Sequence, residues 1–186
     1  SYDRNYFAKI DKNIMKLIED GSPEALRSAM QKIRKSESEY TENERILIAV
    51  AAEIMQLVWP SEKVTWNTFP VSQDNPYTGA INSAKKGVLD TSTGNVDFLT
   101  TLLPALVLVT TKTNASLTAE CEKVVMDAMF YNYNSTLANY LAGIVYERQE
   151  RFTDAESYYS KAYLSDEKNI ELTLAYSKIL GKVNKV

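Results

Sequence analysis

The chain has 186 residues, a formal net charge of −3 at pH 7 and a hydrophobic fraction of 45%. These values are close to the averages for folded domains, so we expect a buried core, and the interleaved charges give no basic footprint for nucleic acid. Histidine is absent and Cys121 is the single cysteine, which excludes Ser–His and Cys–His nucleophile pairs and thiolate zinc clusters. We therefore predict no catalytic residues, no metal, no cofactor and no nucleic-acid partner.

Apolar runs in the sequence are too short to cross a membrane, which takes about 18 or more residues. The richest run, residues 98–109, contains Pro104 and predicts a core helix. We expect no integral membrane segment. The first residue is Ser1 rather than Met, which is compatible with a removed tag or a removed signal peptide. An exported or lipid-tethered bacterial protein is slightly favoured over a cytoplasmic one, and the compartment stays open.

Residues 3–58 predict three helices. Apolar residues at three- and four-residue steps form a stripe over the first segment, residues 2–20. Ser22 is a candidate N-cap with Pro23 at the first position of the second helix. Thr41 and Glu44 have the spacing of a capping box for the third helix, which should end before Pro60.

Residues 59–79 form an unusually long connection that carries both tryptophans and three of the five prolines. Long connections inside a compact domain are usually functional or disordered, and aromatic residues argue against disorder. We expect the segment either to cover an apolar face of the helices, which is favoured, or to form a groove wall from Trp59, Trp66, Phe69 and Tyr77. Asp74-Asn75-Pro76 predicts a turn.

Residues 80–131 predict the central helices. A weak helix follows the long connection over residues 78–90. Residues 96–112 predict a very buried helix that starts late or bends at Pro104. The next helix, over 116–133, places Cys121 on its apolar face, so we expect a buried thiol.

The most specific pattern lies in residues 134–169. Its fixed positions are Gly143, Tyr146, Ala155, Tyr159 and Ala162. Small residues would let two antiparallel helices approach closely while the tyrosines fill the space around the contact, and Thr153 with Glu156 forms a candidate capping box. The spacing resembles a tetratricopeptide repeat, a helix-turn-helix unit of about 34 residues. Three positions depart from the family pattern: Asn139 replaces Trp, Ala142 replaces Leu and Glu167 replaces Pro.

Weaker copies of the same pattern precede this unit. Cys121, Val125 and Ala128 repeat the small-large-small series of the clear repeat, so residues 96–131 resemble a second, more divergent copy. Ala25 and Ala29 form a similar small-residue face, so residues 3–58 resemble a weaker one. Residues 170–183 predict a single capping helix that covers the last apolar face. The resemblance implies one all-α domain over residues 1–186, a right-handed stack of antiparallel helix pairs forming a tetratricopeptide-like α-solenoid.

In this family the first helix of each pair lines a concave face that binds partners. The corresponding residues of the clear repeat are Leu137, Tyr140, Leu141, Ile144 and Arg148, and the capping helix adds Leu174 and Lys178. The resemblance thus implies an apolar, tyrosine-rich groove. The alternative is that Tyr140 and Ile144 only pack against a neighbouring helix.

Two functions follow as hypotheses. The first is a non-catalytic scaffold that binds a protein or peptide partner through this concave face. The second is a small-ligand-binding component of an exported bacterial system, in which Leu103, Val107 and Ile144 would enclose an apolar cavity. The sequence leaves the partner's identity and the oligomeric state open.

Overall fold

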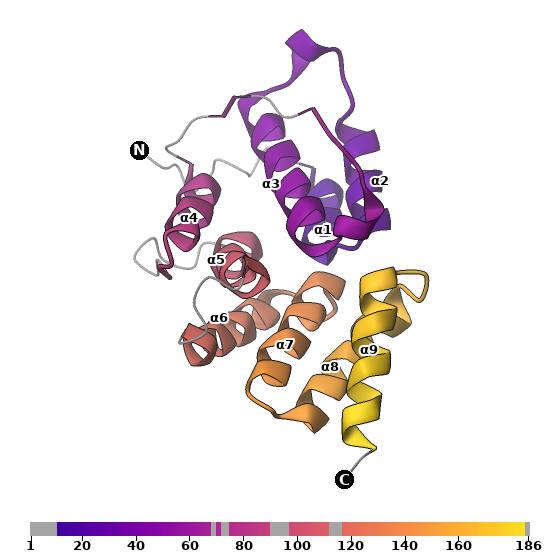
Figure 1. Ribbon diagram of the computed structural model, residues 1–186. Helices are drawn as coiled ribbons and strands as arrows, with labels where there is room; N and C mark the ends of the chain where they lie inside the picture. Colours follow the sequence, from indigo (N-terminus) through magenta and orange to yellow (C-terminus); the bar gives the residue numbers. More distant parts are fainter. Residues whose placement is uncertain (1–10, 68–69, 72–74, 90–96, 112–116, 185–186) are drawn as a thin grey trace.

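The computed structural model describes residues 11–67, 70–71, 75–89, 97–111 and 117–184. All regular secondary structure within these ranges is helical (Figure 1). The helices are α1 (Lys12–Asp20), α2 (Pro23–Ile33), α3 (Glu42–Val58), α4 (Pro76–Lys85), α5 (Phe98–Thr111), α6 (Thr118–Tyr131), α7 (Thr136–Arg148), α8 (Phe152–Ser165) and α9 (Ile170–Val183), with short 3₁₀ turns at Glu37–Glu39 and Pro60–Glu62.

Helices that follow one another in the sequence pack side by side, as expected for an α-helical repeat. The chain runs from α4 through α5, α6, α7 and α8 to α9 with each helix against the next, and α5 also packs against α7 (Figure 1). The N-terminal helices join this array through contacts of α3 with α5 and of α1 with α7. Within the described ranges, no helix is long and apolar enough to cross a bilayer.

Helix starts in the N-terminal part match the capping pattern of the sequence. The Oγ of Ser22 accepts a hydrogen bond from the backbone N–H of Ala25 at 3.3 Å, and Pro23 opens α2. Thr41 caps α3 by accepting from the N–H of Glu44 at 3.2 Å, and its own hydroxyl donates to the Glu44 carboxylate at 3.0 Å. Both N-caps are confirmed, whereas the capping box predicted for Thr41 and Glu44 is only half formed, because the Glu44 carboxylate accepts from the Thr41 hydroxyl. The predicted first helix falls partly on residues 1–10, which lie outside the described residues.

Two predicted boundaries are wrong. Asn75 and Pro76 do not form a simple turn, because the Asn75 side chain accepts from the N–H of Thr78 at 2.8 Å and Pro76 is the first residue of α4. Thr153 is not the N-cap of α8, which begins one residue earlier at Phe152 after Arg151. The reversal of direction is made by Glu150, which adopts a left-handed φ of 58°.

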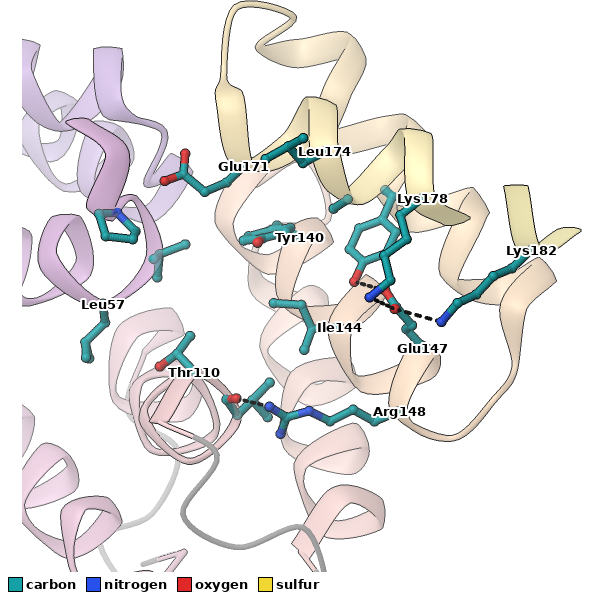
Figure 2. A pocket seen from close by; sticks show the side chains of 15 residues that line it. Leu57, Thr110, Tyr140, Ile144, Glu147, Arg148, Glu171, Leu174, Lys178 and Lys182 are labelled. Atoms are coloured by element: carbon teal, nitrogen blue, oxygen red, sulfur yellow. Dashed lines mark hydrogen bonds and ion pairs between the residues drawn. The ribbon is translucent and has the colours of Figure 1, made fainter. Parts of the chain in front are cut away.

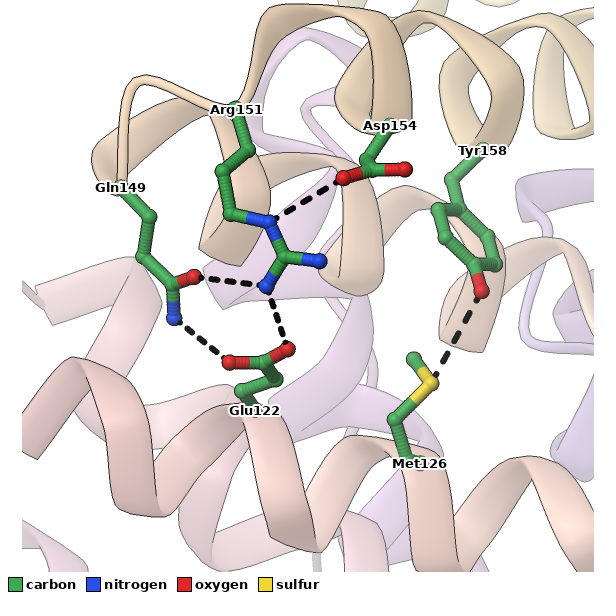
Figure 3. Close-up of polar contacts among 6 residues, drawn as sticks. All are labelled: Glu122, Met126, Gln149, Arg151, Asp154 and Tyr158. Carbon is green, nitrogen blue, oxygen red and sulfur yellow. Dashed lines mark hydrogen bonds and ion pairs between the residues drawn. The ribbon is translucent and has the colours of Figure 1, made fainter.

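A polar cluster fixes the position of Arg151 at the α7–α8 turn (Figure 3). Its guanidinium contacts Glu122 of α6 at 2.8 Å and Asp154 of α8 at 3.1 Å, and lies 4.4 Å from the ring centroid of Tyr146. Gln149 donates a second hydrogen bond to Glu122 at 2.9 Å. These contacts tie the α7–α8 pair to α6, so local capping propensity at Thr153 is overridden by tertiary contacts.

The middle of the molecule is built on α5, which is buried from Phe98 to Val109. Pro104 lies inside this helix, so the predicted late start is wrong. Asp97 caps the helix by accepting from the N–H of Thr100 at 2.9 Å, and the buried Tyr77 of α4 donates its hydroxyl to the same carboxylate at 2.5 Å.

Helices α7 and α8, which correspond to the clear repeat in residues 134–169, form the predicted close helix pair. A Cβ placed on Gly143 of α7 would lie 2.3 Å from Cδ1 of Tyr159 in α8, so the glycine permits the approach of the two helices. Asn139, which stands where the family has Trp, is buried and donates to the carbonyl oxygens of Tyr133 and Ser135 at 3.0 and 2.8 Å. The last helix, α9, has the bounds that the sequence predicts.

A junction between α1 and α7 brings the N-terminal helices onto the best repeat. Gly21, which ends α1 with a left-handed φ of 69°, lies against Leu137, where a Cβ would come within 2.6 Å of the leucine Cβ. The Ser135 hydroxyl donates to the carbonyl of Glu19 at 2.6 Å, and the indole N–H of Trp59 donates to the carbonyl of Gly21 at 2.7 Å. The end of α3, the end of α1 and the start of α7 therefore meet at one point.

Candidate binding groove

A groove of about 560 Å³ lies between α7 and α9 on one side and the ends of α3 and α5 on the other (Figure 2). It is open to solvent, and its lining is mostly apolar. The lining residues are Leu57, Val58, Pro60, Val109, Thr110, Tyr140, Ile144, Glu147, Arg148, Tyr159, Glu171, Leu174, Ala175, Lys178 and Lys182.

Helix α7 supplies the floor through one of its faces. Tyr140, Ile144 and Arg148 follow one another at four-residue steps, which places them on the same side of a helix. Tyr140 and Ile144 are half-buried and point into the space between α9 and the ends of α3 and α5 (Figure 2). Of the seven predicted partner-binding residues, the structure brings five together here: Tyr140, Ile144, Arg148, Leu174 and Lys178.

The other two predicted residues do not face the groove, which corrects the sequence-based assignment. Leu137 and Leu141 are 0% and 2% exposed and belong to the core. Leu137 lies against Gly21 of the α1–α2 turn. Packing of the α1–α2 turn against α7 therefore covers Leu137.

The ring of Trp59 lies beneath the groove floor and does not form a groove wall. Its ring stacks on Tyr140 with a centroid distance of 5.1 Å and an interplanar angle of 19°, and it is 0% exposed. Tyr77 is also 0% exposed. Trp66 is half-buried and does not line the groove, and Phe69 lies outside the described residues. Trp59 and Tyr77 are therefore core residues at the end of α3 and in the first turn of α4, at either side of the connection.

One carboxylate organises the charged side of the groove. Glu147 accepts a hydrogen bond from the Tyr159 hydroxyl at 2.9 Å, and its Oε2 lies 3.3 Å from the Nζ of Lys182 and 3.7 Å from the Nζ of Lys178 (Figure 2). The Lys178 side chain is 67% exposed, so this ion pair is solvent-screened and weak. The Lys178 ammonium can therefore turn toward a bound partner.

Arg148 marks the end of the floor. Its guanidinium donates to the carbonyl oxygen of Val109, near the C-terminus of α5, where a cation is favoured by the helix dipole (Figure 2). This contact holds α5 against α7. The charged lining residues are three cations (Arg148, Lys178, Lys182) and two carboxylates (Glu147, Glu171), so the groove is weakly positive.

The opposite end of the groove is held by a contact between α9 and the turn after α3. Glu171 accepts two hydrogen bonds from Ser61, at 2.9 Å from the backbone N–H and at 2.7 Å from the hydroxyl. Because Ser61 and Glu171 are far apart in sequence, this contact joins the capping helix to the N-terminal helices.

Tyr140 is the polar group of the floor that is available to a ligand. Its hydroxyl makes no hydrogen bond with the part of the chain that the structure describes. Burial, together with the charges of Glu171 and Glu147, raises the pKa of Tyr140 to about 12. The phenol is therefore neutral at physiological pH and can donate or accept one hydrogen bond.

In the ranges that the structure describes, no three acidic or cysteine side chains gather as metal ligands would. Cys121 is buried as predicted, and burial raises the pKa of its thiol to about 11, so the thiolate is scarce at neutral pH. Leu103 and Val107, which the small-ligand hypothesis placed around a cavity, are fully buried and do not line the groove.

Several groove residues are absent from the sequence-based set. Lys182 follows Lys178 by one helical turn, so the helical period alone could have added it. Leu57, Val58 and Val109 come from α3 and α5, whose ends meet α7 only through tertiary packing. Glu171 has no sequence signal, because its role depends on its hydrogen bonds with Ser61.

Comparison with protein-family models, with curated proteins and with solved structures gave no match for this chain.

Proposed function

We propose that this protein is a non-catalytic, tetratricopeptide-like scaffold that binds a peptide segment of a partner protein in the groove between α7 and α9. One observation carries the proposal. Three of the five α7 residues that the repeat pattern assigns to the binding face, Tyr140, Ile144 and Arg148, lie together on the floor of an open groove.

The chemistry of the groove defines the segment that it would accept. Tyr140 and Ile144 offer apolar surface on the floor, and Leu174 at the edge is 65% exposed. An exposed leucine beside a half-buried tyrosine is typical of a surface that gains free energy when an apolar side chain covers it. Lys178 and Lys182 favour an acidic residue next to that apolar anchor.

Site-specific photo-crosslinking tests the proposal in cells of the source organism. Leu174→p-benzoylphenylalanine places the reactive ketone at the groove edge. Leu164→p-benzoylphenylalanine is a matched control, because Leu164 of α8 is 66% exposed and lies outside the groove. We expect one recurrent protein adduct at position 174 and none at position 164, with the crosslinked peptide identified by mass spectrometry.

Binding of that peptide completes the test. The synthetic peptide should bind the purified protein, and Leu174→Glu should weaken binding by about tenfold, which corresponds to about 1.4 kcal/mol, while Leu164→Glu should not. Equal adducts at both positions, or equal effects of the two glutamates, would contradict a groove-binding function.

A second candidate function, the binding of a small apolar ligand, is favoured by the size of the groove. Its volume of about 560 Å³ lies within the range of small-molecule sites. In the crosslinking experiment this function predicts an adduct at position 174 whose added mass is that of a metabolite rather than a peptide.

A further inference from the structure

A second cleft, distinct from the groove, lies between α2, the first half of α3 and the described residues 65–67 and Pro70. Its volume is about 880 Å³. The long aromatic connection that leaves Trp59 under the groove floor supplies one wall of this cleft with Trp66. The size fits a small-molecule site.

Cationic side chains dominate the polar part of this cleft. Arg27, Arg34 and Lys35 line it, and none of the described acidic side chains does. Arg27 pairs with Glu62, and Lys35 pairs with Glu44 at 2.6 Å; both carboxylates lie outside the lining. The two pairs hold their cations in place at the wall.

Arg34 is the cation that is free to bind an anion. It is exposed at the C-terminal end of α2, and no described residue forms an ion pair or a hydrogen bond with its guanidinium. A guanidinium can donate two parallel hydrogen bonds to a carboxylate or a phosphate. The charges of the three cations and their two carboxylate partners leave a net positive cleft.

Aromatic surface faces the same space. Trp66 packs against the hydrophobic core and remains half-buried, whereas Trp59 at the end of α3 and Tyr77 of α4 are fully buried. Tyr40 also lines the cleft, and its hydroxyl accepts a hydrogen bond from the backbone N–H of Lys35 at 3.1 Å. That bond connects the tyrosine to the stretch of chain that carries the cations.

We propose that this cleft binds a small organic anion whose carboxylate or phosphate is carried by a planar ring. Arg34 would hold the anionic group, with Arg27 and Lys35 contributing long-range attraction. The ring would lie on the exposed surface of Trp66 and Tyr40, since aromatic faces stack favourably on planar rings. The site is independent of the groove, because Trp66 and Arg34 do not line the groove.

Fluorine NMR of the protein labelled with 5-fluorotryptophan tests this site. The chain has two tryptophans, so two signals are expected, and Trp59→Phe and Trp66→Phe assign them. The probes are 4-hydroxyphenylacetate with its neutral amide, AMP with adenosine, and acetate and inorganic phosphate as anions without a ring. We expect a saturable shift of the Trp66 signal with at least one ring-bearing anion and no shift of the Trp59 signal. The responding member identifies a carboxylate or a phosphate ligand.

The matched probes and variants distinguish the contribution of the anionic group to binding from that of the ring. The neutral analogue and the anions without a ring should bind about tenfold more weakly than the responding ring-bearing anion. Arg34→Gln should weaken the binding of that anion by about tenfold. Lys168→Gln removes an exposed cation outside the cleft and should leave the affinity for the anion unchanged. No saturable Trp66 shift with either ring-bearing anion would overturn the proposal, and so would equal binding of the neutral analogue or equal effects of the two variants.

Discussion

Gly143→Ala is expected to destabilise the protein, because no space exists for the added methyl group. A Cβ at position 143 would lie 2.3 Å from Cδ1 and 2.4 Å from Cε1 of Tyr159. The tyrosine ring is 3% exposed, and its hydroxyl donates to Glu147, so the ring cannot move away without losing packing and a hydrogen bond. The substitution must therefore separate α7 from α8 or displace Tyr159.

The magnitude follows from two opposing terms. Overpacking a well-filled core costs about 1–3 kcal/mol, and the upper part of this range applies because all three nearest contacts fall below 3.0 Å. Replacing Gly by Ala in a helix interior returns about 1 kcal/mol through helix propensity. We expect a net loss of about 1–2 kcal/mol in the free energy of unfolding.

Gly181→Ala in α9 is the matched control. It gains the same helix propensity, and a Cβ there would have no neighbouring heavy atom within 4 Å. Urea denaturation followed by circular dichroism should show stabilisation of up to about 1 kcal/mol for this variant. Gly143→Ala should lower the midpoint by about 0.5–1 M at a slope of about 2 kcal/mol/M. If Gly143→Ala is as stable as Gly181→Ala, the steric argument is wrong.

Three further predictions concern buried and bridging polar groups. Hydrogen bonds from Gln149, and secondarily from Arg151, lower the pKa of Glu122. The ionised Glu122 carboxylate therefore contributes its whole stabilisation of the fold above the ordinary pKa of 4.5, and this contribution is lost as the pH falls through the pKa of the folded state. In an NMR titration Gln149→Ala should raise that pKa, and an unmoved pKa would contradict the assignment. Cys121, whose pKa burial raises to about 11, should react with Ellman's reagent at pH 8 slowly when folded and rapidly in urea; fast reaction of the folded protein would count against its burial. Glu171→Ala should speed hydrogen exchange at the Ser61 amide, and unchanged exchange would argue against the bridge between α9 and α3.

Local signals explain which parts of the fold could be predicted from the sequence. Ser22 and Thr41 act as N-caps because their side chains bond to backbone groups three residues ahead, within the same segment. The contact of Gly143 with Tyr159 follows from repeat spacing, since the two residues lie in one helix pair. The floor of the groove was predictable for the same reason, because a four-residue step places Tyr140 and Ile144 on one face.

Long-range contacts explain why some features of the fold and of the groove could not be predicted from the sequence. Leu137 appears equivalent to Tyr140 in the repeat pattern, and only the return of α1 onto α7 buries it against Gly21. Arg151, rather than the predicted Thr153, is the residue before the first turn of α8, because its guanidinium is bound by Glu122 of α6. Neither partner lies near these residues in sequence, so periodicity and capping rules carry no information about them.

The groove belongs to the whole array, although the repeat signal is clear only in residues 134–169. Helix α7 alone would present Tyr140 to solvent with nothing beneath it. Trp59, from the end of α3, stacks under that ring and is itself held by the Gly21 carbonyl at the end of α1. The described N-terminal residues 11–59 therefore set the position of the floor as well as contributing Leu57 to the wall. We expect any partner that binds in the groove to depend on the N-terminal helices, even at positions that it does not touch.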